Sequence, residues 1–175
     1  MKKRIILLLS ILMFSASPAF ARSPFSGKPI KKAGNFGVGV GAGTLATGLS
    51  MKYFLSDSTS VQGNVGFWRG CFGCGRFRGN FYSDALALSV DFLLERGPLG
   101  GDSQFSVDWE IGAGGGLGFN DNANLGLGVS GVLGLQLNIH AIPIDLVIEF
   151  RPGIIIVPDV YLNLVDFTGH VRYYF

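Results

Sequence analysis

The sequence has little charge. Asp, Glu, Lys and Arg make up 15% of its 175 residues, whereas an ordinary soluble domain has about 25%. With 48% hydrophobic residues, the chain is also too apolar to remain a solvated coil. The formal net charge is only +2, which gives no reason to expect nucleic-acid binding, because that function requires a strongly basic face. The composition therefore excludes a disordered chain and disfavours a typical soluble domain.

Long apolar runs are also missing. Beyond the N-terminus, no stretch of 18 apolar residues runs without polar interruption, so the sequence predicts no transmembrane helix. Glycine interrupts most windows that are long enough to test for helical periodicity, and glycine disfavours helix interiors. The sequence therefore argues against a helical fold of either the soluble or the membrane type.

Cysteine is scarce, and both cysteines lie in one short motif. Cys71 and Cys74 are separated by two residues, and neither histidine is close to them in the sequence, so the four ligands of a structural zinc site are not at hand. In an exported chain we expect a disulfide between them, with a redox role as the alternative. The flanking Arg69, Arg76 and Arg78 suit lipopolysaccharide phosphates, because guanidinium pairs well with phosphate. A solvated basic loop is the competing interpretation.

The N-terminus has the pattern of an export signal. Three basic residues precede an apolar run from Ile5 to Phe14, and Ala19-Phe20-Ala21 provides a small-residue cleavage site. This pattern predicts a signal peptide over residues 1–21. Its removal takes away three basic side chains and changes the formal net charge from +2 to −1. Residues 22–34 are then interpreted as a basic, solvated periplasmic leader segment, which its prolines and glycine keep irregular.

The remainder of the chain, residues 35–175, alternates with a period of two, which is typical of β-strands. The final segment is the clearest case, with Val171, Tyr173 and Phe175 on one face and His170 and Arg172 on the other. Seven more segments repeat the pattern. The eight predicted strands lie near 36–41, 48–54, 61–67, 85–92, 105–111, 125–140, 145–151 and 165–175.

The connections between these strands differ in length. Residues 55–59, 95–102 and 141–143 are tight or rich in turn residues, whereas 69–80, 115–124 and 153–162 are longer. Short turns at one end and longer loops at the other are typical of bacterial outer-membrane barrels. The apolar segment 153–158 breaks the alternation, and it is either an apolar outer loop or the top of the seventh strand.

Alternation alone also fits a soluble sandwich or a lipocalin-type cup, in which the apolar face turns inward. The opposite face here is mostly Gly, Ala, Ser, Thr and Asn. A face exposed to water would normally carry more charged residues. In a membrane barrel the apolar face meets lipid and the small polar residues fill a narrow lumen. The sequence therefore predicts an all-β fold, an eight-stranded antiparallel transmembrane β-barrel with up-and-down meander order.

Four tracts carry a resemblance to known proteins. They are the glycine-rich segment 36–41, the segment 47–56, the segment 144–153 and the ending 171–175. Together they resemble small outer-membrane barrels of the OmpA/OmpX-like kind, and within that kind a family with no assigned activity, over about residues 35–175. The resemblance implies location in the bacterial outer membrane. It also implies that Val171, Tyr173 and Phe175 form the signal read by the barrel-assembly machinery.

The charged residues on the inward face are the candidate site. We expect them to form a plug of ion pairs and hydrogen bonds, because buried charges must be paired; a two-carboxylate active site is the sharper alternative. The predicted network consists of Asp91, Asp108, Glu110, Asp145, Glu149, Arg151, Asp166, His170 and Arg172, with Lys52 as a further base.

Catalysis has little support in the sequence. Barrel lipid hydrolases use a Ser/His pair, and the H-x-S spacing of such sites is absent around His140 and His170. Both histidines are expected near the periplasmic ends of their strands. We therefore expect no cofactor, no catalytic residues and no nucleic-acid partner. The predicted protein is a monomeric envelope protein whose outer loops contact lipopolysaccharide, a surface or a partner; the alternatives are a lipid-modifying enzyme and a small pore.

Overall fold

The structure is a computed structural model that describes residues 30–43, 46–67, 86–119, 125–157 and 160–175. The predicted signal peptide, most of the leader segment, Cys71 and Cys74, and Arg69, Arg76 and Arg78 lie outside these residues. Within the described part of the chain, no helix is long and apolar enough to cross a bilayer.

The described residues form one sheet of ten strand segments. Their bounds are β1 Phe36–Ala42, β2 Thr47–Ser56, β3 Thr59–Phe67, β4 Leu86–Gly101, β5 Phe105–Phe119, β6 Leu125–Ile139, β7 Ile144–Phe150, β8 Gly153–Val157, β9 Tyr161–Asn163 and β10 Phe167–Tyr174.

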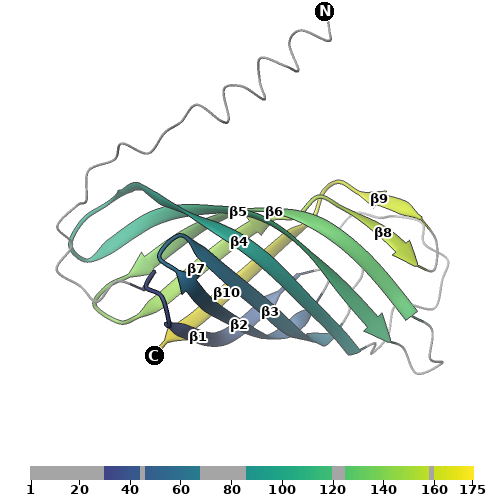
Figure 1. The fold of residues 1–175 in the computed structure, drawn as a ribbon, viewed down its shortest axis with the longest axis horizontal. Coiled ribbons are helices and arrows are strands. Elements are labelled where there is room, and N and C mark those ends of the chain that lie inside the picture. Colours follow the sequence, from purple (N-terminus) through teal and green to yellow (C-terminus); the bar gives the residue numbers. More distant parts are fainter. Residues whose placement is uncertain (1–29, 44–45, 68–85, 120–124, 158–159) are drawn as a thin grey trace, which may run out of the picture.

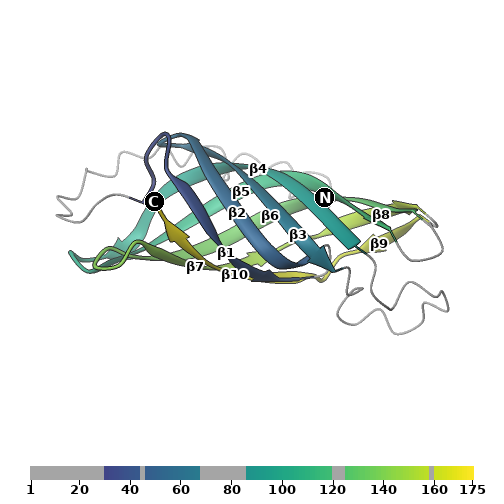
Figure 2. The same cartoon turned by 90° about the horizontal axis from the view of Figure 1, so that it is seen from below.

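The sheet closes on itself as a barrel of eight antiparallel walls. β1 pairs with both β2 and β10, which joins the first wall to the last. β7 and β8 both pair with β6 and together form the seventh wall, interrupted at Arg151 and Pro152. β9 pairs with β8, and β10 pairs with β7, so these two segments form the eighth wall. The predicted eight-stranded meander is confirmed, and the closed outline with its tilted strands is visible in two views (Figures 1 and 2).

Two ends of the barrel can be distinguished. The C-terminus, the β4–β5 hairpin and the β6–β7 turn lie at one end, called the turn end below, and β8 and β9 lie at the other, called the loop end (Figure 1). Residues 95–101, predicted as a turn, instead extend β4, and the hairpin bends only at 102–104. Residues 115–119, predicted as a loop, instead extend β5 and pair with β6. Both predictions were wrong because a continuing ladder with a neighbouring strand outweighs the turn preference of glycine.

The apolar segment 153–157 continues the seventh wall. Ile155 is buried while Ile154 and Ile156 are exposed, and Gly153 and Ile154 pair with Ser130 and Val129 of β6. Of the two interpretations of this segment, the structure supports a strand at the top of the wall and not an apolar loop.

The distribution of polarity is reversed relative to a water-soluble protein. Along each strand the outward side chains are apolar, such as Val90, Leu135 and Ile148, which are all more than half exposed. Many of the alternate, inward side chains are polar or charged and buried, such as Lys52 and Glu110. Soluble proteins bury charged residues only rarely and in pairs. This barrel instead has charged residues in its interior and an apolar wall.

Small apolar clusters close the interior at both ends. At the turn end, Ile30 packs with Phe54 and Tyr174, and the two rings lie 5.7 Å apart. At the loop end, Ala46, Ala87 and Ile155 are buried together, with Tyr161 against them. Apolar side chains therefore lie at both ends of the charged interior.

Residues 30–34 differ from the solvated leader expected there. Ile30 is buried and the Lys31 side chain is only 14% exposed. Backbone bonds hold the segment, with Gly34 N donating to the Phe54 carbonyl at 2.9 Å. The end of the leader is thus part of the folded barrel, because Ile30 packs into the turn end.

Candidate functional site: the charged lumen

The structure places all nine residues of the predicted network in the barrel interior. Each is at least nine-tenths buried. They come from β4, β5, β7 and β10 and from the two short breaks in the seventh and eighth walls. Period-two alternation positions them, since it turns every second side chain inward. The network divides into three groups that share partners.

The first group surrounds Arg151, which lies at the break between β7 and β8. Its Nη1 donates to Glu149 Oε2 at 2.9 Å, and its Nη2 donates to Asp91 Oδ1. His170 Nε2 lies 3.3 Å from Glu149 Oε2. His170 is opposite Gly41 and Val147 in the ladders, so it lies well inside the barrel and not at the strand end expected from the sequence.

The second group surrounds Arg172 on β10. Its Nη2 donates to Asp145 Oδ2 at 2.9 Å, and its Nε lies 3.2 Å from both carboxylate oxygens of Asp145. Tyr174 Oη donates to the same Asp145 Oδ2 at 2.7 Å. One carboxylate thus receives donors from two residues of the last strand, which ties β7 to β10 beyond their backbone ladder.

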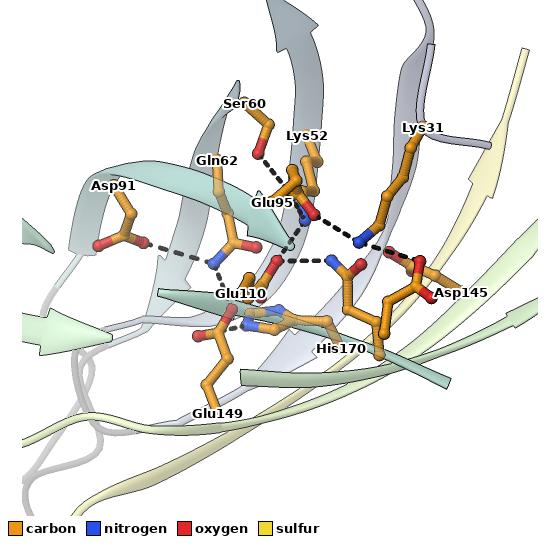
Figure 3. Close-up of polar contacts among 12 residues, drawn as sticks. Lys31, Lys52, Ser60, Gln62, Asp91, Glu95, Glu110, Asp145, Glu149 and His170 are labelled. Carbon is orange, nitrogen blue, oxygen red and sulfur yellow. Dashed lines mark hydrogen bonds and ion pairs between the residues drawn. The ribbon is translucent and has the colours of Figure 1, made fainter. Parts of the chain in front are cut away.

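Gln62 on β3 links these two groups across the lumen. Its Nε2 donates to Glu149 Oε1 at 2.9 Å and to Asp91 Oδ2 at 3.4 Å, and its Oε1 accepts from Arg172 Nη1. Figure 3 shows Gln62 between Asp91 and Glu149. Gln62 is not among the residues predicted from the sequence for this network. Its inward register beside Lys52 on β2 was the signal that could have identified it.

The third group lies nearer the turn end and is centred on Lys52. Its Nζ lies 2.5 Å from Glu110 Oε2 and 2.6 Å from Glu95 Oε1, and all three side chains are buried. Ser60 Oγ donates to Glu95 Oε1 at 2.6 Å, and Gln136 Nε2 donates to Glu110 Oε2 at 2.5 Å. Glu95 was assigned to a turn in the sequence analysis, which is why it was missed.

Lys31 joins this third group from the N-terminal segment (Figure 3). Its Nζ lies 3.1 Å from Glu95 Oε2 and 3.0 Å from Asp108 Oδ2, and it donates to the Arg96 carbonyl at 3.1 Å. Asp108 also accepts from Asn138 Nδ2 at 3.0 Å. The remaining predicted residue, Asp166, accepts from the Arg151 backbone N–H at 2.9 Å through its carbonyl oxygen.

Carboxylates outnumber cations in this lumen. Seven acidic side chains are buried in the described interior, against Lys52, Arg151 and Arg172, with Lys31 partly exposed. Several buried acceptor oxygens near the turn end lack a protein donor. They are Asp108 Oδ1, Glu110 Oε1, Gln136 Oε1 and Asn138 Oδ1. The turn-end part of the lumen thus has spare capacity to accept hydrogen bonds.

The fold creates one Ser–His contact that sequence spacing did not reveal. His140 Nε2 lies 3.3 Å from Ser106 Oγ, although 34 residues separate them. Ser106 is buried on the inward face, not on the outer wall where a lipid substrate would meet it. This placement does not match the arrangement expected of a lipid-hydrolysing barrel.

The three residues of the predicted assembly signal point outward from the last strand. Val171, Tyr173 and Phe175 are all exposed, and the rings of Tyr173 and Phe175 meet edge to face with centroids 5.1 Å apart. They are therefore accessible on the apolar wall beside β1, although the recognition itself remains a prediction.

Within the described residues, no group of three or more His, Cys, Asp or Glu side chains is arranged to hold a metal ion. Comparison with protein-family models, with curated proteins and with solved structures found no match.

Proposed function

We propose that the chain is a small integral outer-membrane β-barrel protein of the OmpA/OmpX-like kind, with a closed lumen and no enzymatic activity. Its role is to present the outer loops to lipopolysaccharide, a surface or a partner. The observation that carries the proposal is the reversed polarity, with charged side chains buried and apolar side chains covering the wall. A bilayer favours this arrangement because lipid solvates the wall and the closed ladder satisfies the backbone.

The orientation follows from the two ends of the barrel. We assign the turn end to the periplasm and the loop end to the outside, since short turns face the periplasm in bacterial barrels. The C-terminal segment with Tyr173 and Phe175 then lies where periplasmic assembly factors can bind it.

A closed lumen disfavours the alternative of an open pore. An ion pair crosses the interior from β2 to β5 and a hydrogen bond crosses it from β3 to β7, and apolar clusters lie at both ends. Planar-bilayer recordings of the full chain are expected to show no steady conductance. A persistent open channel would contradict the proposal.

Two matched arginine substitutions test the membrane assignment. Ile148 and Leu99 are equally exposed, at 67% and 65%. Ile148 lies in the middle of a wall and Leu99 lies on the β4–β5 hairpin, beyond the β2–β3 turn. In a bilayer, Ile148→Arg should cost about 2–4 kcal/mol and Leu99→Arg about 0–1 kcal/mol. In a soluble protein the two should be alike.

The measurement is folding into lipid vesicles followed by heat-modifiable gel migration of the outer-membrane fraction. Wild type and Leu99→Arg should shift on heating, and Ile148→Arg should fold poorly. Equal behaviour of the two variants, or recovery of wild type from the soluble periplasm, would overturn the proposal.

Lipid-A mass spectra from cells with and without the protein test the enzyme alternative, and an altered acyl pattern would support it.

A further inference from the structure

The position of Lys31 suggests a binding site at the turn-end mouth. Its ammonium has three oxygen neighbours at 3.0–3.1 Å, from Glu95, Asp108 and the Arg96 carbonyl. The contact with the Arg96 carbonyl is a hydrogen bond, and the Glu95 and Asp108 carboxylate oxygens lie at ion-pair distance. The mouth therefore has the geometry of a primary-ammonium site.

The surroundings of the site also point to a cation. Asp108 Oδ1 and Asn138 Oδ1 are buried next to the Lys31 contact and have no protein donor. Glu95 already neutralises Lys52, so its charge is shared between two ammonium groups. An acceptor-rich mouth of this kind favours a hydrogen-bonding cation over an anion.

A divalent metal ion fits the mouth poorly. Calcium takes six to eight oxygen ligands at about 2.3–2.6 Å, whereas the cation position here has three oxygens at ammonium distances. Within the described part of the chain, no cluster of acidic and histidine side chains meets the requirements of a metal.

The segment that supplies Lys31 is held by few bonds. Besides the Lys31 contacts and buried Ile30, the Gly34 N–H donates to the Phe54 carbonyl and the Ala33 N–H donates to Asp57 Oδ1 at 3.2 Å. Asn35, next to the first strand, donates to the carbonyls of Ile30 and Lys32 within the segment. It has no strand ladder, since the first strand begins at Phe36. The segment can leave the mouth without breaking the barrel sheet.

We propose that the mouth is a primary-ammonium site, filled here by Lys31 and available to a small alkylammonium ion when residues 30–34 withdraw. The proposal rests on the proposed closed lumen and deepens it. An amine that replaces Lys31 would release the N-terminal segment, and its positive charge would still pair with the carboxylates of Glu95 and Asp108.

Chemical rescue tests this proposal directly. Lys31→Ala removes the atoms of n-propylammonium and leaves their space open, so the full chain in detergent should unfold about tenfold faster than wild type, because carboxylates lose a partner. Added n-propylammonium should restore most of the wild-type rate. Tetramethylammonium, which has the charge but no N–H donor, should not.

Three control variants accompany the experiment. Lys31→Met fills the space without a charge, so it should unfold fast and resist rescue. Lys32→Ala removes an exposed neighbouring lysine and should match wild type. Asp108→Asn added to Lys31→Ala should weaken the rescue, since it neutralises one acceptor.

The readout is the rate at which the heat-modifiable, folded band disappears. The proposal is overturned if Lys31→Ala unfolds at the wild-type rate, if tetramethylammonium or calcium rescues as well as n-propylammonium, or if Lys31→Met is rescued equally. Membrane insertion is scored separately on the unheated band, so a failure of the outer-membrane assignment is distinguishable from a failure of the ammonium site.

Discussion

The two halves of the barrel interior are built on different principles. Toward the turn end, Lys52 and Glu110 form an ion pair that crosses the lumen, and Arg172 forms one with Asp145 on the neighbouring strand. Toward the loop end, the inward positions hold Ala87, Ile155 and a series of small residues. The small residues of this half are Gly116, Gly118, Gly126 and Gly128.

The two halves should therefore respond differently to side-chain substitutions. In the charged half, one truncated side chain leaves an opposite charge buried without its partner, which is costly. The inward alanine and glycine residues of the other half form no ion pairs, so there the limit is space. Substitutions that remove atoms should therefore act on the charged half, and substitutions that add atoms should act on the other.

The largest expected effect is on Arg172. Arg172→Met keeps the length of the side chain but leaves Asp145 with only the Tyr174 hydroxyl as a side-chain donor. We expect a loss of about 3–5 kcal/mol in the free energy of unfolding, measured by urea denaturation in lipid vesicles. Val171→Met, on the exposed face of the same strand, is the control. Equal losses in the two variants would show that the charge network is not the cause.

The hydroxyl of Ser60 should have the next largest effect. Ser60→Ala removes a 2.6 Å hydrogen bond to the buried Glu95 carboxylate, and a bond to a charged group contributes about 1.5–3 kcal/mol. The same urea denaturation measures it. A loss below about 0.5 kcal/mol, the range of ordinary surface changes, would show that the two lysines satisfy Glu95 without Ser60.

Adding atoms tests the small-residue half. Ala87→Leu places three extra carbons against Ala46 and Ile155, and overpacking of this kind costs about 1–3 kcal/mol. Ala113→Leu adds the same atoms on the exposed face of β5 and should be neutral in vesicles. If Ala87→Leu is also neutral, the loop end has room for larger side chains and the contrast between the halves is weaker than proposed.

The smallest expected effect is at Ser50. Its hydroxyl is buried and has no hydrogen-bond partner among the described residues, so Ser50→Ala should change the free energy of unfolding by no more than about 0.5 kcal/mol. Compared with Ser60→Ala, this substitution removes the same atom from the same inward face. A large loss at Ser50 would reveal a bound water molecule that completes the network.

The sequence predicted the part of the interior that depends on alternation alone. Asp91, Glu110 and Arg172 each lie on a clear period-two segment, and the strand register turns them inward without further information. The pairing of the charges was not predictable, because it depends on which strands face each other across the closed ring. Gln62, for example, reaches Glu149, 87 residues away.

The errors came from local signals that long-range pairing overrode. Gly97, Pro98, Gly100 and Gly101 indicated a turn, which hid Glu95 in a predicted connection. The β4–β5 ladder continues past them with one irregularity between Arg96 and Gly100. Lys31 was missed for a related reason, since its proline- and glycine-containing segment has no periodicity that would predict a place inside the barrel.

The walls of the barrel are joined over very different lengths, and this has a consequence for how the ring opens. β5 and β6 are paired continuously from Phe105 to Phe119, whereas β1 meets β10 only from Gly37 to Ala42. Gly39 allows close approach there, because a Cβ at this position would meet the Val171 carbonyl oxygen. Since opening a ladder requires breaking its bonds in turn, mechanical unzipping should begin beside β1, whose ladders with β10 and β2 are both short, and should reach β5 last.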